Sequence, residues 1–174
     1  MSENNKDSKN ELSVENYLNI LFDQNELVNA PNTAQDIQVE SLKKIKDRNW
    51  NSSFICINPL KIRRKDSNVT SYRNFLFECD QDGVSLDMQM EIIRESKLPV
   101  STIVYSGNKS YHFVISLQQC IETETEYRNA WKRIFLKLEA VAGRMFPSLT
   151  QDLQKQAQGR PKSFFDSACK NPSR

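Results

Sequence analysis

A short apolar segment that ends in two acidic residues constrains the fold of this chain more than any other feature. Residues 75–80 read FLFECD, and the Asp82-Gly83 pair that follows is typical of a turn. Side chains alternate between the faces of a strand, so we expect Glu78 and Asp80 on one face and Cys79 on the other. Because the segment is mostly apolar, it predicts a central, buried strand over residues 74–80.

Two solvated acids at the end of a strand are common, and that is the simplest interpretation of Glu78 and Asp80. A buried strand favours a different one, because carboxylates held near its end lose hydration. Neighbouring carboxylates also repel each other, and a hard divalent cation with oxygen ligands relieves both costs. The pair therefore predicts a metal site.

A second motif, YSGNKSYH at residues 105–112, contains the only histidine of the chain. Apolar and β-branched residues flank it, and the Ser-Gly-Asn stretch at 106–108 predicts a turn between strands 100–105 and 110–117. Ser110 and His112 are expected on one face of the second strand. A lone histidine is most often a structural hydrogen-bond donor, but beside Lys109 it suits the binding of a phosphate group.

The remaining pattern predicts an α+β domain, an RRM-like antiparallel sheet with helices packed on one face and the acidic residues and His112 on the other. Residues 1–10 are polar throughout and predict a disordered tail, which leaves residues 11–174 as one domain. The helices are expected at 13–22, 37–47, 86–96, 122–146 and 152–158, and further strands at 53–57 and 163–166.

Composition excludes several classes of protein. The four cysteines form no C-x-x-C pair and predict reduced thiols rather than a zinc site. No apolar run approaches the roughly 20 residues of a membrane span, and the N-terminus has no apolar core of a signal peptide. We therefore expect a cytoplasmic protein with no membrane partner. Basic residues gather at 61–65 and at 160–174; the first cluster alone is best interpreted as a solvated surface.

Three motifs together resemble the archaeo-eukaryotic primase superfamily, particularly the primase-polymerase domains of phages and plasmids. They are the acid-x-acid of Glu78-Cys79-Asp80, the S-x-H of Ser110-Tyr111-His112, and the later acid of Phe165-Asp166. The string SGNKSYH is similar to the SGgKSxH form of many phage members, and residues 171–174 (NPSR) look like the start of that family's N-P-x-R segment. The resemblance is specific for residues 75–117 and 164–174 and faint before residue 51.

The resemblance implies a DNA primase-polymerase that transfers nucleotides from (d)NTPs to a primer or an initiating nucleotide. Two Mg²⁺ or Mn²⁺ ions would be held by Glu78, Asp80 and Asp166. The incoming triphosphate would be bound by a set of basic and hydroxyl residues, namely Ser106, Lys109, Ser110, His112 and Arg174. The implied partners are a single-stranded DNA template and a replicative helicase or accessory domain. Because the family continues past the third acid, we also expect residues 11–174 to be truncated at the C-terminal end.

Two other functions are compatible with the same residues. An RRM-like module without catalysis would bind nucleic acid by stacking bases on aromatic side chains such as Phe77 and Tyr105. The carboxylates argue against this function, because without a metal they would repel a phosphate backbone. A metal-dependent nuclease would use the same acids to shorten a strand rather than extend it.

Overall fold

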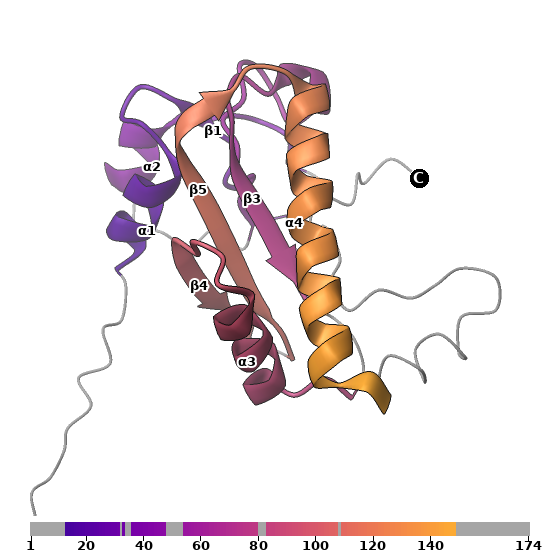
Figure 1. The fold of residues 1–174 in the computed structure, drawn as a ribbon. Coiled ribbons are helices and arrows are strands. Elements are labelled where there is room, and N and C mark those ends of the chain that lie inside the picture. The colour runs from indigo at the N-terminus through magenta and orange to yellow at the C-terminus, as the bar shows by residue number, and fades with distance from the viewer. Residues whose placement is uncertain are drawn as a thin grey trace, which may run out of the picture.

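The computed structural model describes residues 13–31, 33, 36–47, 54–79, 83–107 and 109–148, and these residues form a mixed α+β fold (Figure 1). Within them lie four α-helices, a three-stranded antiparallel sheet and a two-stranded one. The predicted α+β class and antiparallel sheet are thereby confirmed. The predicted tail at 1–10, helix at 152–158 and strand at 163–166 lie outside the described residues.

The larger sheet brings the two sequence motifs onto adjacent strands. Its order is β3 (Tyr72–Glu78), β5 (Tyr111–Ile121) and β4 (Thr102–Tyr105), and both neighbouring pairs are antiparallel. In the described part of the chain β5 is therefore the middle strand and β3 lies at an edge, contrary to the prediction of a central strand at 74–80. The apolar character of β3 comes instead from cores on both of its faces.

Helices pack against one face of this sheet. α3 (Leu86–Ser96) and α4 (Glu124–Met145) pack there against Phe75, Phe77 and Phe113, which are at most 1% exposed. The ring of Trp131 on α4 stacks on Phe77 with ring centroids 5.4 Å apart. Cys79, next along the chain after Glu78, is buried in the same core, as the alternation predicts.

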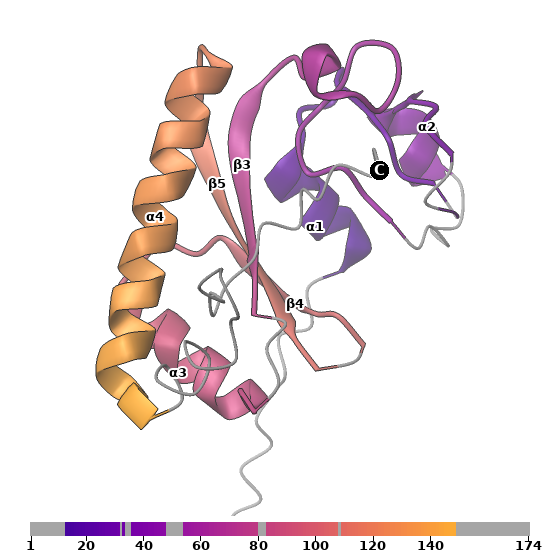
Figure 2. The same cartoon turned by 90° about the vertical axis from the view of Figure 1, so that its right-hand side faces the viewer.

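The opposite face is partly covered as well, which the sequence did not predict. α1 (Val14–Leu21) buries Leu18 and Leu21 in a second core that includes Val114 of β5 and contacts Leu76 of β3. Figure 2 shows α1 and α2 on the side of the sheet away from α4, toward the end where β3 begins. The acidic end of β3 lies at the other end of the sheet.

Three helices follow their sequence signals closely. Ser13 caps α1, because its Oγ accepts the backbone N–H of Asn16 at 3.1 Å. α3 spans the predicted residues 86–96; Ser85 caps it, and it ends at Lys97 in the left-handed conformation with φ of 51°. α4 begins two residues after its predicted start, with Thr123 as its cap.

One predicted helix is shorter than expected, and one predicted strand does not form over its described residues. Only the last part of 37–47 is helical, as α2 (Leu42–Asp47), because β2 (Glu40–Ser41) pairs with β1 (Leu27–Val28) immediately before it. Residues 54–57 form no strand: their described backbone bonds are single contacts such as Cys56 N–H to the Asn29 carbonyl at 2.9 Å. A short 3₁₀ helix, η1 (Asp66–Asn68), interrupts the polar connection before β3.

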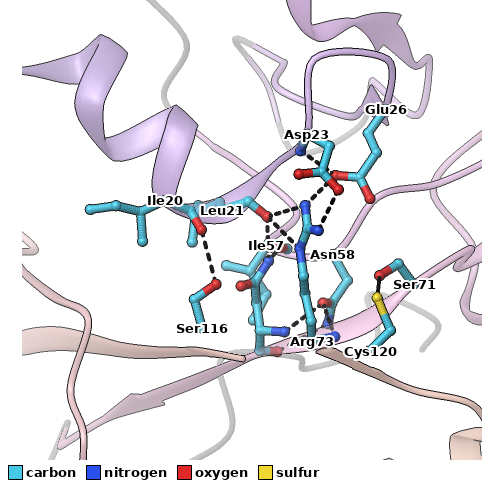
Figure 3. Close-up of polar contacts among 11 residues, drawn as sticks. Ile20, Leu21, Asp23, Glu26, Ile57, Asn58, Ser71, Arg73, Ser116 and Cys120 are labelled. Carbon is cyan, nitrogen blue, oxygen red and sulfur yellow. Dashed lines mark hydrogen bonds and ion pairs between the residues drawn. The ribbon is translucent and has the colours of Figure 1, made fainter. Parts of the chain in front are cut away.

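A buried polar network ties α1 to the start of β3 (Figure 3). The guanidinium of Arg73 donates to the Leu21 carbonyl at the end of α1 and forms ion pairs with Asp23 and Glu26. The neighbouring Asn74 amide donates to the same Leu21 carbonyl at 2.8 Å. These donors satisfy a carbonyl that has no partner within the helix, and the positive charge favours the negative end of the helix dipole.

The longest described helix, α4, has 22 residues and carries many charged side chains. No helix within the described ranges is both long and apolar enough to cross a membrane.

Candidate functional site

Glu78 is the last residue of β3, and its side chain projects from the face opposite α4. Phe77 and Cys79 on either side of it are buried in the core under α4, whereas the Glu78 side chain is 21% exposed. The apolar–acidic alternation therefore fixes which way this carboxylate points.

His112 lies directly across from Glu78 on the middle strand. The two residues are partners in the β3–β5 register, and His112 Nε2 is 2.7 Å from Glu78 Oε2. On its other side His112 is opposite Val104 of β4, which is 38% exposed. A row of three side chains thus crosses the sheet at this level, with the acid–histidine pair beside an exposed apolar residue.

The turn between β4 and β5 lies beyond this row, and its described residues, 106, 107, 109 and 110, are called here the Ser106–Ser110 turn. The strand ladder continues into it, because Ser106 N–H donates to the Ser110 carbonyl at 3.0 Å. The Ser110 hydroxyl donates to Ser106 Oγ at 3.1 Å. Gly107 has a φ of +85°, which only glycine adopts without strain, and a Cβ there would meet nothing within 4 Å. Lys109 is exposed, whereas Ser110, at the end of the turn, is buried.

The amide of Gln89 on α3 binds the backbone of this turn. Its Nε2 donates to the Lys109 carbonyl at 2.9 Å, and its Oε1 accepts the Tyr111 N–H at 2.9 Å. The side chain is 1% exposed. Sequence reasoning missed Gln89, although a signal existed: it is a polar residue on the stripe of α3 that also carries the buried Ile92, Ile93 and Ser96.

Five of the eight predicted site residues are described, and they gather at one end of the sheet: Glu78, Ser106, Lys109, Ser110 and His112. Asp80, Asp166 and Arg174 lie outside the described residues. Among the residues that are described, no group of three or more His, Cys, Asp or Glu side chains could hold a metal ion. Of the predicted ligands, Glu78 alone is described; its Oε2 contacts His112, and its Oε1 takes no part in that contact.

Clefts elsewhere do not include the predicted site residues. One, of about 360 Å³, lies between α1 and the sheet and is lined by Asn19, Asp23, Arg73 and Ser116 among others. Another, of about 370 Å³, lies near β2 and is lined by Asp36, Gln38 and Lys44 among others. Neither of these two clefts therefore includes the Glu78–His112 pair.

The two aromatic residues predicted to stack on bases differ in accessibility. Phe77 is fully buried between Phe113 and Trp131, so its face is not available to a nucleic acid. Tyr105 at the end of β4 is 50% exposed and makes an edge contact with Tyr111. The prediction that Phe77 binds bases is wrong, because the helix-covered face of the sheet forms the main core.

No family model, curated protein or solved structure matches the chain.

Proposed function

We propose that this chain is the catalytic core of a primase-polymerase of the archaeo-eukaryotic primase type, with an RRM-like sheet. The observation that carries the proposal is the contact between Glu78 and His112. These residues are 34 positions apart in the sequence and belong to two separate motifs, yet their side chains meet on one sheet face. An acid–histidine pair beside a basic, hydroxyl-bearing turn suits phosphate chemistry.

Glu78, Asp80 and Asp166 would hold two Mg²⁺ or Mn²⁺ ions, which neutralise charge on the triphosphate and lower the pKa of the attacking hydroxyl. Carboxylate oxygens are suitable ligands for both ions, and Glu78 is partly exposed with one oxygen outside its contact with His112. The turn residues Ser106, Lys109 and Ser110 would bind phosphate oxygens together with His112 and Arg174. Template-directed transfer then depends on positioning and charge neutralisation rather than on a covalent intermediate.

The test is a primer-extension assay with a single-stranded DNA template, labelled dNTPs or NTPs, and Mg²⁺ or Mn²⁺, with and without a primer. We expect nucleotide incorporation that EDTA abolishes. The Asp80→Ala variant is expected to lose extension by at least about 100-fold, because a metal ligand is removed, while its thermal unfolding stays close to wild type. Asp87→Ala, which removes an exposed acid in the first turn of α3, serves as the matched control and is expected to extend normally.

The same assay separates the alternative functions. A labelled primer that becomes shorter would identify a nuclease, and template binding that is insensitive to EDTA without any incorporation would identify a binding module. Full extension by Asp80→Ala would show that the metal site has been placed on the wrong residues.

A further inference from the structure

The side-chain amide of Gln89 supplies a hydrogen-bond acceptor that the backbone of β3 would supply if this strand were one residue longer. Glu78, the last residue of β3, is opposite His112, so the next position would face Tyr111. The Ser110 carbonyl points to the β4 side of the strand, where it accepts the N–H of Ser106, the residue after β4. Backbone groups alternate in direction along a strand, so the Tyr111 N–H points to the β3 side. Gln89 Oε1 accepts this N–H at 2.9 Å.

The nitrogen of the same amide binds the backbone on the other side of Ser110. Gln89 Nε2 donates to the carbonyl of Lys109 at 2.9 Å and to that of Val84, before α3, at 3.2 Å. Ser110 therefore lies between two backbone groups that one buried side chain binds. A side chain that is 1% exposed and uses both its donor and its acceptor has little freedom to rotate.

We propose that Gln89 is a positioning residue that fixes the Ser106–Ser110 turn for a nucleoside triphosphate; the identity of the ligand rests on the proposed function. Gln89 touches no substrate itself. It sets the backbone on both sides of Ser110 and so sets where Lys109 and Ser110 present their side chains before the ligand arrives. A backbone that is already held at Lys109 and Tyr111 loses less conformational entropy on binding, so we expect Gln89 to lower the KM for the nucleotide rather than to raise kcat.

Two variants of Gln89 and one matched control test this role. Gln89→Met keeps the length of the side chain but loses every hydrogen bond, and Gln89→Glu keeps an acceptor for Tyr111 while losing the donor to Lys109. Ser96→Ala is the control: Ser96 lies on the same helix and is also 1% exposed, but its hydroxyl bonds only to Ile93 and Leu98. It therefore reports the effect of losing a buried polar group from α3 without disturbing the turn.

The first measurement is amide hydrogen exchange by NMR, which needs no activity. We expect exchange of the Tyr111 amide to accelerate by at least about tenfold in Gln89→Met and less in Gln89→Glu, because the latter retains its acceptor. In Ser96→Ala this amide is expected to exchange as in wild type. Equal acceleration in Gln89→Met and Ser96→Ala would reduce Gln89 to a general contributor to stability and overturn the proposal.

The second measurement is steady-state nucleotide incorporation at varied dNTP concentration. Gln89→Met is expected to raise KM about tenfold with kcat within about twofold of wild type, whereas Ser96→Ala changes neither. An unchanged KM in Gln89→Met, with an active wild type, would overturn the positioning role alone. A wild type that neither binds nor incorporates a nucleotide would instead refute the proposed function, and with it the ligand assigned to the turn.

Discussion

At the scale of single residues, we expect the contact between Glu78 and His112 to contribute little to the stability of the fold. The His112 side chain is 33% exposed and that of Glu78 is 21% exposed, so solvent screens their interaction. Pairs of this kind stabilise proteins by about 1 kcal/mol at most. A variant that removes one partner can therefore report on function with little interference from unfolding.

We expect His112→Ala to lower kcat/KM for nucleotide incorporation by about 10- to 150-fold. That range corresponds to losing one hydrogen bond to a charged phosphate, about 1.5–3 kcal/mol. Its melting temperature is expected to change by only a few degrees. Ser116→Ala is the control, because Ser116 lies on the same strand and face but donates to the Ile20 carbonyl, far from the turn. It should lose about 1 kcal/mol of stability and retain full activity.

The reverse pattern would contradict the site. If His112→Ala unfolded more readily than Ser116→Ala while extending primers normally, His112 would be a structural donor, which is the commoner role of a single histidine. Differential scanning fluorimetry and primer extension on the same preparations distinguish the two outcomes.

The surroundings of a single residue could be predicted where they depend on its neighbours in the sequence, and not where they depend on other elements. The directions of Phe77 and Cys79 follow from alternation along one strand, and both are buried as expected. The partners of Arg73 and Gln89 lie on other elements, at the end of α1 and in the turn before β5. No spacing within β3 or α3 specifies those partners, so the sequence could at best have marked each residue as polar in an otherwise buried position.

At the scale of elements, the hairpin of β4 and β5 depends on its glycine. Gly107 has a φ of +85°, in the left-handed region that side chains with a Cβ disfavour. Space is not the constraint, because nothing lies within 4 Å of a Cβ built there. The cost of a substitution at this position is therefore backbone strain alone.

Gly107→Ala is expected to destabilise the protein by about 1–2 kcal/mol, the cost of holding an L-residue in the left-handed region. Gly107→Asn is the matched control and is expected to cost less, since asparagine visits this region more readily. Urea denaturation measures both free energies of unfolding. Equal costs for the two variants would mean that the turn changes its backbone conformation when a side chain is added.

Elements with a capping residue and an apolar pattern that repeats over several turns were predicted well, and elements with neither signal were not. α3 has Ser85 before it and an apolar stripe over three turns, and its bounds match the prediction. β1 and β2 are two residues each, too short for a period of two to be visible. Residues 54–57 carry a strand-like composition, but their backbone bonds to the 29–31 segment rather than to a ladder.

At the scale of the whole molecule, the three-stranded sheet lies between two cores, and Arg73 helps to hold the smaller one in place. It connects the end of α1 to β3, the strand that carries Glu78 at its other end. Burial raises the pKa of Glu26, although the Asp23 N–H and the charge of Arg73 lower it. Burial also opposes the charge of Arg73, but its bond to Asp23 and the charge of Glu26 outweigh this and raise the Arg73 pKa.

Arg73→Met removes the charge that partly offsets the burial of Glu26, so the pKa of Glu26 rises further in the folded variant. A carboxyl whose folded pKa exceeds its unfolded value of about 4.3 destabilises the fold as pH rises past that value. We therefore expect the loss of stability, about 3–5 kcal/mol at pH 7, to be smaller at pH 4, where Glu26 is mostly protonated in both states.

Arg128→Met is the control for this experiment, because it also breaks an arginine–glutamate pair, but with the arginine side chain 64% exposed. A pair so exposed contributes less than about 1 kcal/mol, so the control is expected to unfold almost as wild type does at both pH values. Urea denaturation at pH 4 and pH 7 measures all four differences. A loss of stability in Arg73→Met that is the same at both pH values would show that its hydrogen bonds to the Leu21 carbonyl, rather than its charge beside Glu26, hold α1 against the sheet.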